Sequence, residues 1–121
     1  MTKEDMKLRL RNFALQIVSL VNDMPPTIAG NAIARQIIRS GTSPAANYRA
    51  ACLGKSDKDF LNKLKMVEEE LDETMHWLDM IVGSGMIEKE RVLPLYQENQ
   101  ELFRIVVSSI LTVRRRLEQS V

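Results

Sequence analysis

The sequence predicts an all-α fold, an antiparallel up-down bundle of four helices formed by one domain over residues 1–121. Apolar residues recur at steps of three and four in four separate segments, which is typical of amphipathic helices. Short segments with proline or glycine separate these four segments. The composition is 45% hydrophobic but only 5% aromatic, which favours interdigitating aliphatic helices over β-sheets.

The first helix is predicted from an apolar stripe near the N-terminus. The stripe comprises Met6, Leu10, Phe13, Ile17, Leu20 and Met24. Pro25 and Pro26 follow it directly. Because proline cannot donate to the helical hydrogen-bond ladder and disfavours helix in the residue before it, the two prolines predict the end of this helix.

The second helix is predicted to begin after Thr27, a residue type that caps helix N-termini. Its core-facing residues are predicted to be Ile28, Ile33, Ile37 and Ile38. The segment Gly41–Pro44 then combines a flexible residue, two hydroxyl side chains and a proline. We therefore expect a kink or a brief break there before residues 45–53 continue as helix, and we expect Gly54 to end it.

The third helix is predicted to begin at Ser56, which forms a capping-box pattern with Asp59. Its apolar stripe comprises Phe60, Leu64, Val67, Leu71, Met75, Leu78 and Val82. Gly83–Gly85 is expected to end this helix. The last helix has Pro94 near its predicted start, and its stripe comprises Leu95, Asn99, Leu102, Val106, Ile110, Val113 and Leu117.

Surplus apolar residues predict that the chain self-associates. Three short turns join the helices, so antiparallel neighbours are the most economical topology. Several apolar residues nevertheless lie off the main stripes: Leu61, Trp77, Met80, Tyr96, Phe103 and Leu111. At least one helix pair is therefore expected to have a second apolar face, which points to an oligomer.

The composition also predicts where the protein resides. No apolar run approaches the roughly 20 residues that a membrane-spanning helix needs. The N-terminal residues Met1–Asp5 lack the charged-then-apolar order of a secretory signal. We therefore expect a cytoplasmic protein without a membrane partner. The single cysteine, Cys52, cannot form an intrachain disulfide and is interpreted as a small buried apolar residue.

No constellation of residues predicts catalysis. Glu73 and His76 are spaced like half of the di-iron carboxylate pattern, and Glu69 and Asp72 lie beside them. That site needs two such pairs and further glutamates from two other helices, whereas the chain has one histidine. No glycine-framed nucleophile and no phosphate-binding loop is present. We expect no enzymatic activity, no cofactor, no metal and no small-molecule substrate.

The charges are divided along the chain although the formal net charge is only +1. Residues 31–65 hold seven basic and two acidic side chains, whereas residues 66–101 hold ten acidic and two basic ones. The seven basic residues are candidate contacts to RNA or DNA phosphates: Arg35, Arg39, Arg49, Lys55, Lys58, Lys63 and Lys65. Ion pairing within one subunit or between subunits is the alternative use of these charges. Arg114–Arg116 are interpreted as complementing the helix dipole.

A polar network is predicted between the second and third helices. Its members are Asn47, Tyr48, Arg49, Glu69, Glu70 and Glu73. If Arg49 were buried against a carboxylate, it would set the register of the bundle, and removing one partner would cost about 3–5 kcal/mol.

Several motifs resemble one protein family. They are Ile37–Ser43 (IIRSGTS), Ala46–Ala51 (ANYRAA), Lys55–Ser56, Phe60–Leu64 (FLNKL), Val67–Thr74 (VEEELDET) and Trp77–Leu78. Their order resembles the bacterial four-helix-bundle proteins first noticed as products of intervening sequences within large-subunit ribosomal RNA genes, often labelled ribosomal-protein-like. The resemblance extends from the first helix to about Leu111. The sequence departs from the usual pattern at Pro44 and Ala45, where an aliphatic residue and glycine are common.

The resemblance implies a homopentameric ring of up-down bundles without a cofactor. The chain is also similar to accessory proteins of diversity-generating retroelements, which share the bundle and bind a reverse transcriptase and nucleic acid. Two hypotheses follow. The first is a non-enzymatic homo-oligomer that binds RNA or DNA, in a ribosomal RNA context, through a basic face. The second is a protein–protein interaction scaffold that does not bind nucleic acid.

Overall fold

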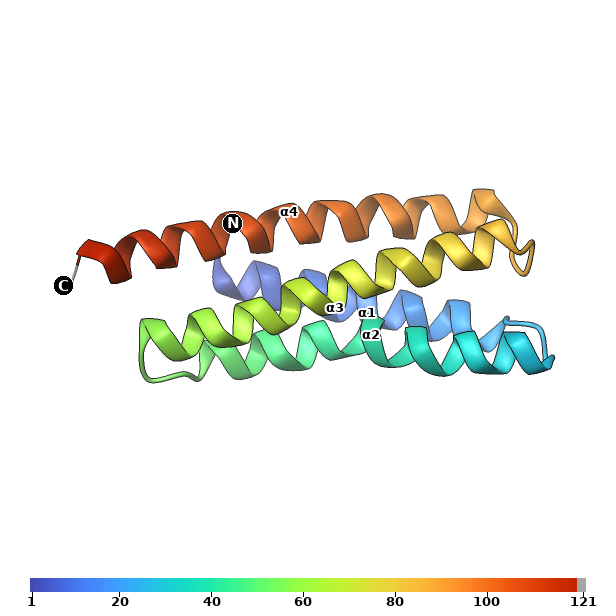
Figure 1. The fold of residues 1–121 in the computed structure, drawn as a ribbon, viewed down its shortest axis with the longest axis horizontal. Coiled ribbons are helices and arrows are strands. Elements are labelled where there is room, and N and C mark those ends of the chain that lie inside the picture. The colour runs from blue at the N-terminus through green and yellow to red at the C-terminus, as the bar shows by residue number, and fades with distance from the viewer. Residues whose placement is uncertain (120–121) are drawn as a thin grey trace.

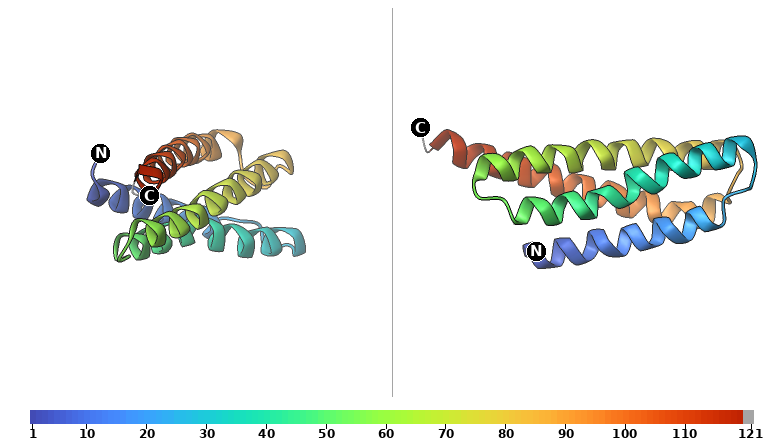
Figure 2. Two further views of the ribbon diagram at one scale, coloured as in Figure 1. Left: turned by 60° about the vertical axis from the view of Figure 1, so that its left-hand side comes forward. Right: turned by 90° about the horizontal axis from the view of Figure 1, so that it is seen from below.

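The computed structural model describes residues 1–119 and confirms an all-α bundle of four helices. They are α1 (Lys3–Asn22), α2 (Ile28–Cys52), α3 (Asp57–Gly83) and α4 (Lys89–Gln119). Consecutive helices run in opposite directions along one long axis (Figure 1). Each helix packs against the next one in the chain, whereas the remaining neighbours around the bundle, α1 and α4, contact each other much less (Figure 2). The bundle is therefore most open along the seam between α1 and α4.

Hydroxyl side chains cap the N-termini of the first three helices. The backbone N–H of Gly30 donates to Thr27 Oγ1 over 3.0 Å, and that of Asp59 donates to Ser56 Oγ over 3.1 Å. Both of these caps confirm the sequence prediction. At the start of α1, Thr2 and Asp5 form a reciprocal capping box. These side chains satisfy backbone donors that have no partner within the helix.

The second helix runs unbroken from Ile28 to Cys52, with Pro44 inside it. The expectation of a brief break at Gly41–Pro44 is therefore wrong, while a kink there stays a prediction. Pro44 is buried, so its ring contributes to packing although it removes one backbone donor. Helix α2 packs against both α1 and α3, and within this segment Gly41 lies against Ile17 of α1.

The turn between α3 and α4 forms where the sequence predicts it. Helix α3 ends at Gly83, and Gly85 has a φ of +75°, which a residue without a side chain adopts readily. Helix α4 then begins at Lys89, so Pro94 is its sixth residue. The helix thus begins earlier than Pro94 alone suggested.

The predicted apolar stripes form one continuous core along the bundle. All members of the α1 stripe up to Leu20 are buried, and so are most members of the α3 and α4 stripes. The prediction that Ile28 faces the core is wrong, because its side chain is 93% exposed at the first position of α2. Ile33 and Ile38 pack against the core only in part, and Cys52 is half-buried.

Three polar side chains, Ser40, Thr74 and Asn99, are fully buried in this core. The hydroxyls of Ser40 and Thr74 lie 2.9 Å apart and share a hydrogen bond between α2 and α3. Asn99 donates from Nδ2 to the backbone oxygen of Leu71 over 3.0 Å. Its Oδ1 has no hydrogen-bond partner among the described residues. Asn99 is therefore a polar group whose burial costs free energy.

Helices α1 and α2 approach each other closely at Gly41. A Cβ atom built on Gly41 would lie 2.8 Å from Cγ1 and 2.9 Å from Cγ2 of Ile17. Ile17 is itself fully buried, so it has no room to move aside. Glycine is thus required at this position by packing, whereas its backbone conformation is an ordinary helical one.

Across residues 1–119, none of the four helices combines the length and the apolar character that spanning a membrane requires.

Candidate nucleic-acid interface

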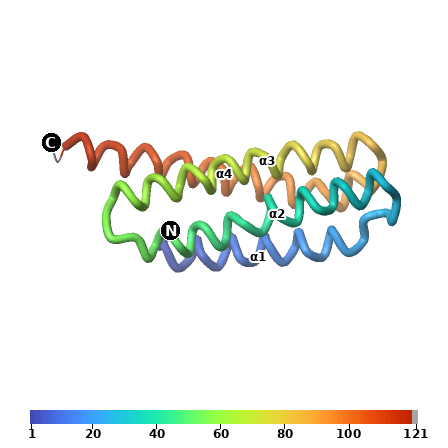
Figure 3. The backbone as a smooth tube through the Cα atoms, turned by 60° about the horizontal axis from the view of Figure 1, so that its bottom comes forward, coloured from blue at the N-terminus to red at the C-terminus, as the bar shows by residue number. Residues whose placement is uncertain are grey.

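Three segments that are far apart in the sequence meet at one end of the bundle. The start of α1, the α2–α3 turn and the last turns of α4 lie there together (Figures 1 and 3). Arg116 Nη2 on α4 lies 3.4 Å from Asp57 Oδ1 at the start of α3. Lys3 Nζ on α1 lies 4.5 Å from the centroid of the Phe60 ring on α3. These contacts fix the three segments relative to each other.

This end of the molecule carries an excess of positive charge. Residues 1–7, 49–59 and 112–119 hold eight basic and five acidic side chains. We call seven of these cations the basic end: Lys3, Arg49, Lys55, Lys58, Arg114, Arg115 and Arg116. All seven are exposed. The opposite end, residues 19–31 and 77–92, holds two basic and four acidic side chains, so the bundle has opposite charge at its two ends.

The structure unites only part of the predicted basic set. Arg49, Lys55 and Lys58 lie together at the basic end. Arg35 lies in the first half of α2. Because α2 begins at the opposite end and runs toward the basic end, Arg35 lies nearer the opposite end.

The other members of the predicted set differ in their surroundings. Arg39 pairs with Glu73 on α3 at 2.5 Å. Lys63 and Lys65 are half-buried on α3. The seven candidate residues therefore do not form one face.

Four members of the basic end were not among the candidates predicted from the sequence, namely Lys3 and Arg114–Arg116. The three arginines were assigned to the helix dipole alone. The predicted topology contained a usable signal, because an antiparallel bundle places the C-terminus of its fourth helix beside the turn between its second and third helices. Charge counted along the sequence could not reveal this neighbourhood.

A small hollow of about 230 Å³ lies at the basic end and receives residues from all four helices. Lys3, Ser108 and Arg116 contribute polar atoms to its lining, beside Tyr48 and Phe60. The two rings pack edge to face with centroids 6.4 Å apart. Burial, with a smaller contribution from the neighbouring Cys52, raises the pKa of the Tyr48 hydroxyl to about 12. Tyr48 is therefore a buried, neutral core residue at every physiological pH.

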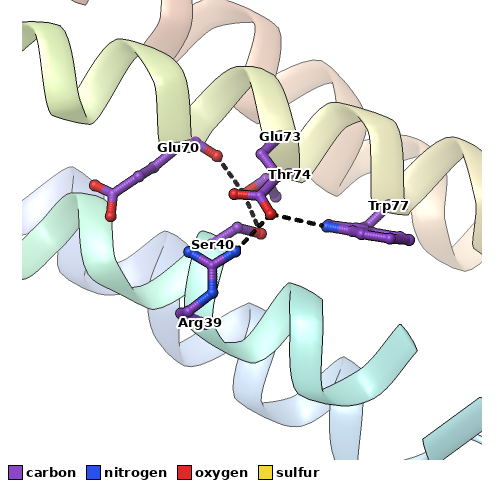
Figure 4. Close-up of polar contacts among 6 residues, drawn as sticks. All are labelled: Arg39, Ser40, Glu70, Glu73, Thr74 and Trp77. Carbon is purple, nitrogen blue, oxygen red and sulfur yellow. Dashed lines mark hydrogen bonds and ion pairs between the residues drawn. The ribbon is translucent and has the colours of Figure 1, made fainter. Parts of the chain in front are cut away.

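A polar network connects the middle of α2 to α3 (Figure 4). The Thr74 hydroxyl lies 2.8 Å from the backbone oxygen of Glu70 and 2.9 Å from the Ser40 hydroxyl. Since Thr74 has one proton, it can donate to Glu70 while it accepts from Ser40. This pair is buried, so it favours one register between the two helices.

Two carboxylates of α3, those of Glu70 and Glu73, extend this network toward the surface by accepting further hydrogen bonds. Glu73 Oε1 accepts hydrogen bonds from Arg39 Nη2 over 2.5 Å and from Trp77 Nε1 over 3.4 Å. Glu70 Oε1 accepts from Asn47 Nδ2 over 2.8 Å. The ion pair of Arg39 is half exposed, so its net contribution to stability is small.

The predicted network is thus realised in part and with a different arginine. Asn47, Glu70 and Glu73 take part in it, and Arg39 occupies the role expected of Arg49. Arg49 is exposed in the last turn of α2, so the condition under which it would set the register, burial against a carboxylate, is not met. Tyr48 faces the core instead, and Glu69 is exposed on α3. The physical reason is helical phase, since residues 47, 48 and 49 point in three directions about 100° apart.

Replacement of Glu70 by glutamine is expected to stabilise the fold at neutral pH. Burial raises the pKa of the Glu70 carboxyl above its ordinary value, while the Asn47 hydrogen bond and the Arg39 charge oppose this shift. The folded state therefore holds the proton more tightly than the unfolded state, and stability falls as the pH rises through the folded pKa. Glutamine removes the charge and keeps an acceptor for Asn47.

Urea unfolding of the wild type and the Glu70→Gln variant at pH 7 and below pH 4 measures this effect. The variant should be more stable at pH 7, and the difference should shrink in acid. An equal difference at both pH values would contradict the titration of Glu70 as its cause. Glu69→Gln is the matched control, because Glu69 is exposed on the same helix.

The acidic residues of α3 do not assemble a metal site in the part of the chain that the structure describes. No group of three or more histidine, cysteine, aspartate or glutamate side chains is placed to hold a metal ion within residues 1–119. His76 packs instead against the edge of the Trp77 ring, with centroids 4.7 Å apart.

Comparisons with known proteins agree with the fold. The family model of the 23S rRNA-intervening sequence protein matches residues 4–108. The chain is also similar to the crystal structure of a protein of unknown function from the S23 ribosomal protein family, from Bacteroides thetaiotaomicron. The two are 31% identical over 87% of this chain and 97% of the other, with a TM-score of 0.82. No curated protein shows significant sequence similarity.

Proposed function

Because the chain belongs to the family of 23S rRNA-intervening sequence proteins, we propose that it is a non-enzymatic, homo-oligomeric protein of the cytoplasm that binds RNA or DNA. It needs no cofactor for this role. The basic end carries the proposal, since seven exposed cations from three segments gather there. Arginine and lysine side chains bind phosphate oxygens, and several of them on one side of a fold supply affinity without reading sequence.

The acids near the basic end are largely engaged with other groups. Asp5 caps the backbone of α1 through Thr2, and Asp57 lies beside Arg116. Glu4 pairs with Lys7 at 2.9 Å. Arg114 and Arg115 extend from the exposed side of the last turns of α4. The acidic opposite end would repel a polyanion, so the charge distribution also orients its approach.

Exposed apolar side chains support self-association. Leu8 and Leu15 on α1 are 57% and 51% exposed. Leu8 borders a groove of about 590 Å³ whose lining includes Ala45 and Ala46 of α2. On the α3–α4 side, Met80 and Leu93 are 43% and 42% exposed. Contact between two different faces repeats around a ring if the rotation closes.

Solution mass tests the oligomer. Light scattering behind a sizing column should give about five chains if the ring that the family resemblance implies is formed. A monomer would contradict the homo-oligomeric part of the proposal.

A pair of matched double variants tests nucleic-acid binding. Arg114→Gln with Arg115→Gln removes two charges from the basic end, and Arg35→Gln with Lys89→Gln removes two charges elsewhere. Arg116 is left intact because it contacts Asp57. We expect the first variant to weaken binding of a fluorescent RNA about tenfold at low salt and to reduce the salt slope by about one unit per lost phosphate contact.

The control variant should bind within about twofold of the wild type, since its charges lie away from the interface. Equal losses in both variants would show that net charge alone matters and would contradict the basic end as the site. Circular dichroism of each variant checks that the bundle is folded.

A protein–protein interaction scaffold without nucleic-acid binding is the second candidate. Cross-helix ion pairs favour it, because Arg9 pairs with Glu98 at 2.6 Å and Arg39 with Glu73 at 2.5 Å. These contacts show charges of opposite sign used between helices. In the RNA titration, this candidate predicts no binding by the wild type even at low salt.

A further inference from the structure

None of the six aromatic side chains of the protein is exposed. All of them lie within residues 1–119. Phe13, Tyr48 and Phe60 are buried in the core. The other three, Trp77, Tyr96 and Phe103, are partly buried against it. Among residues 1–119, no phenylalanine, tyrosine or tryptophan ring is therefore fully exposed. The exposed imidazole of His76 contacts the Trp77 ring in the second half of α3, away from the basic end.

The two rings closest to the basic end are also covered. Tyr48 is 5% exposed and Phe60 is 8% exposed. Each ring packs against the other, and the Lys3 ammonium lies over the Phe60 ring. A nucleobase could not stack on either ring without displacing core contacts. The exposed large apolar side chains at this end are Met1 and Leu53, which have no flat π-face.

The absence of a stacking platform decides which polyanion the basic end prefers. Proteins that bind single strands gain about fivefold or more in affinity per base from stacking on aromatic rings. When a surface binds only through charge, its affinity instead increases with the charge density of the ligand. Double-stranded nucleic acid carries about one phosphate charge per 1.7 Å and releases more counterions per contact than a single strand. A duplex is also more rigid than a single strand, so it loses less conformational entropy when it binds.

We propose that the basic end binds the sugar–phosphate backbone of double-stranded nucleic acid in preference to single strands, without reading base sequence. This inference rests on the proposed function of the basic end. Its cations come from three segments and surround the end of a bundle, which suits contact with neighbouring phosphates of a rigid helix. The bases of a duplex are already stacked on each other, so they need no aromatic partner from the protein.

Fluorescence anisotropy with the full-length protein tests the preference. The probes are two 20-base-pair RNA duplexes of unrelated sequence and a 20-nucleotide oligouridine, each titrated at several salt concentrations. We expect each duplex to bind about tenfold more tightly than the single strand, and the two duplexes to agree within about twofold. A single strand that binds as tightly as the duplexes would overturn the inference while the proposed function stands. If no probe binds at low salt, the proposed function itself fails.

An added aromatic side chain provides a second, independent test. Leu53 is 77% exposed between Arg49 and Lys55, and Ile28 is 93% exposed at the opposite end of the bundle. Leu53→Trp should raise the affinity for oligouridine about fivefold or more and leave duplex affinity nearly unchanged. Ile28→Trp is the matched control and should change neither affinity. If Leu53→Trp leaves the affinity for the single strand unchanged, the missing platform is not the cause of the preference, and the inference is wrong.

Discussion

Replacement of Asn99 by aspartate is expected to lower the free energy of unfolding by about 3–5 kcal/mol at pH 7, because it buries an unpaired charge. Asn99 is fully buried, and its Nδ2 donates to the backbone oxygen of Leu71. A carboxylate would place negative charge against that oxygen. Burial would raise the pKa of the new carboxyl, so the loss should shrink in acid, where the protonated side chain can donate to Leu71.

Replacement of Asn99 by leucine should instead raise the free energy of unfolding. Leucine removes the buried Oδ1 atom, which has no hydrogen-bond partner in the part of the chain that the structure describes. This replacement should stabilise the fold by about 1–3 kcal/mol. Chemical denaturation of the wild type and both variants at pH 7 measures the two effects. A leucine variant less stable than the wild type would mean that the hydrogen bond to Leu71 outweighs the unpaired oxygen.

Asn99 would then favour a single register between the helices at the expense of stability. A polar group in an apolar seam disfavours alternative registers, because any shift leaves it without its partner. The stabilised leucine variant is the appropriate material for detecting such registers. Broadened side-chain resonances in the NMR spectrum of this variant would indicate more than one packing arrangement.

Replacement of Gly41 by valine is expected to destabilise the protein by about 3 kcal/mol, the upper part of the range for overpacked cores. The new Cβ would lie 2.8 Å from Ile17 Cγ1, and the two further methyl groups would enlarge the overlap. Better helix propensity would return less than about 1 kcal/mol. The variant should therefore force α1 and α2 apart, and thermal unfolding measures the loss.

Gly83 provides the matched control for this variant. It is the last residue of α3, and no atom lies within 4 Å of a Cβ built there. Gly83→Val should change stability by less than about 0.5 kcal/mol. Equal losses at both positions would indicate that backbone preference, and not the contact with Ile17, determines the requirement for glycine at position 41.

Local signals in the sequence predicted most of the fold correctly. The stripe from Met6 to Leu20 is buried, and Thr27 and Ser56 cap the helices that they were expected to begin. The errors arose where tertiary contacts overrule local preference. Helix α2 continues through Pro44 because α1 and α3 pack on both sides of it. Ile28 is exposed because it lies at the tip of α2, where no neighbour covers it.

The candidate site was predicted less well than the fold. The basic segment around Lys55 and Lys58 was identified, but Arg35 and Arg39 point elsewhere and Arg114–Arg116 were assigned another role. Side chains that lie far apart in sequence share a surface only if their helices meet there. The ion pair to α3 is formed by Arg39 with Glu73. Arg49 is exposed although Tyr48 is buried, since one residue of difference rotates a side chain by about 100° around a helix.

The sequence by itself determined the four helices, the caps at Thr27 and Ser56 and most residues of the core, because periodicity and capping act within one or two helical turns. Only the tertiary structure decided that cations of α1, the α2–α3 turn and α4 form one basic end, and that all six phenylalanine, tyrosine and tryptophan rings are buried or partly buried. It also decided that Gly41 must lack a side chain and that Oδ1 of Asn99 has no hydrogen-bond partner within residues 1–119. These properties depend on which faces meet across the bundle, and that choice is made by the packing of the whole chain.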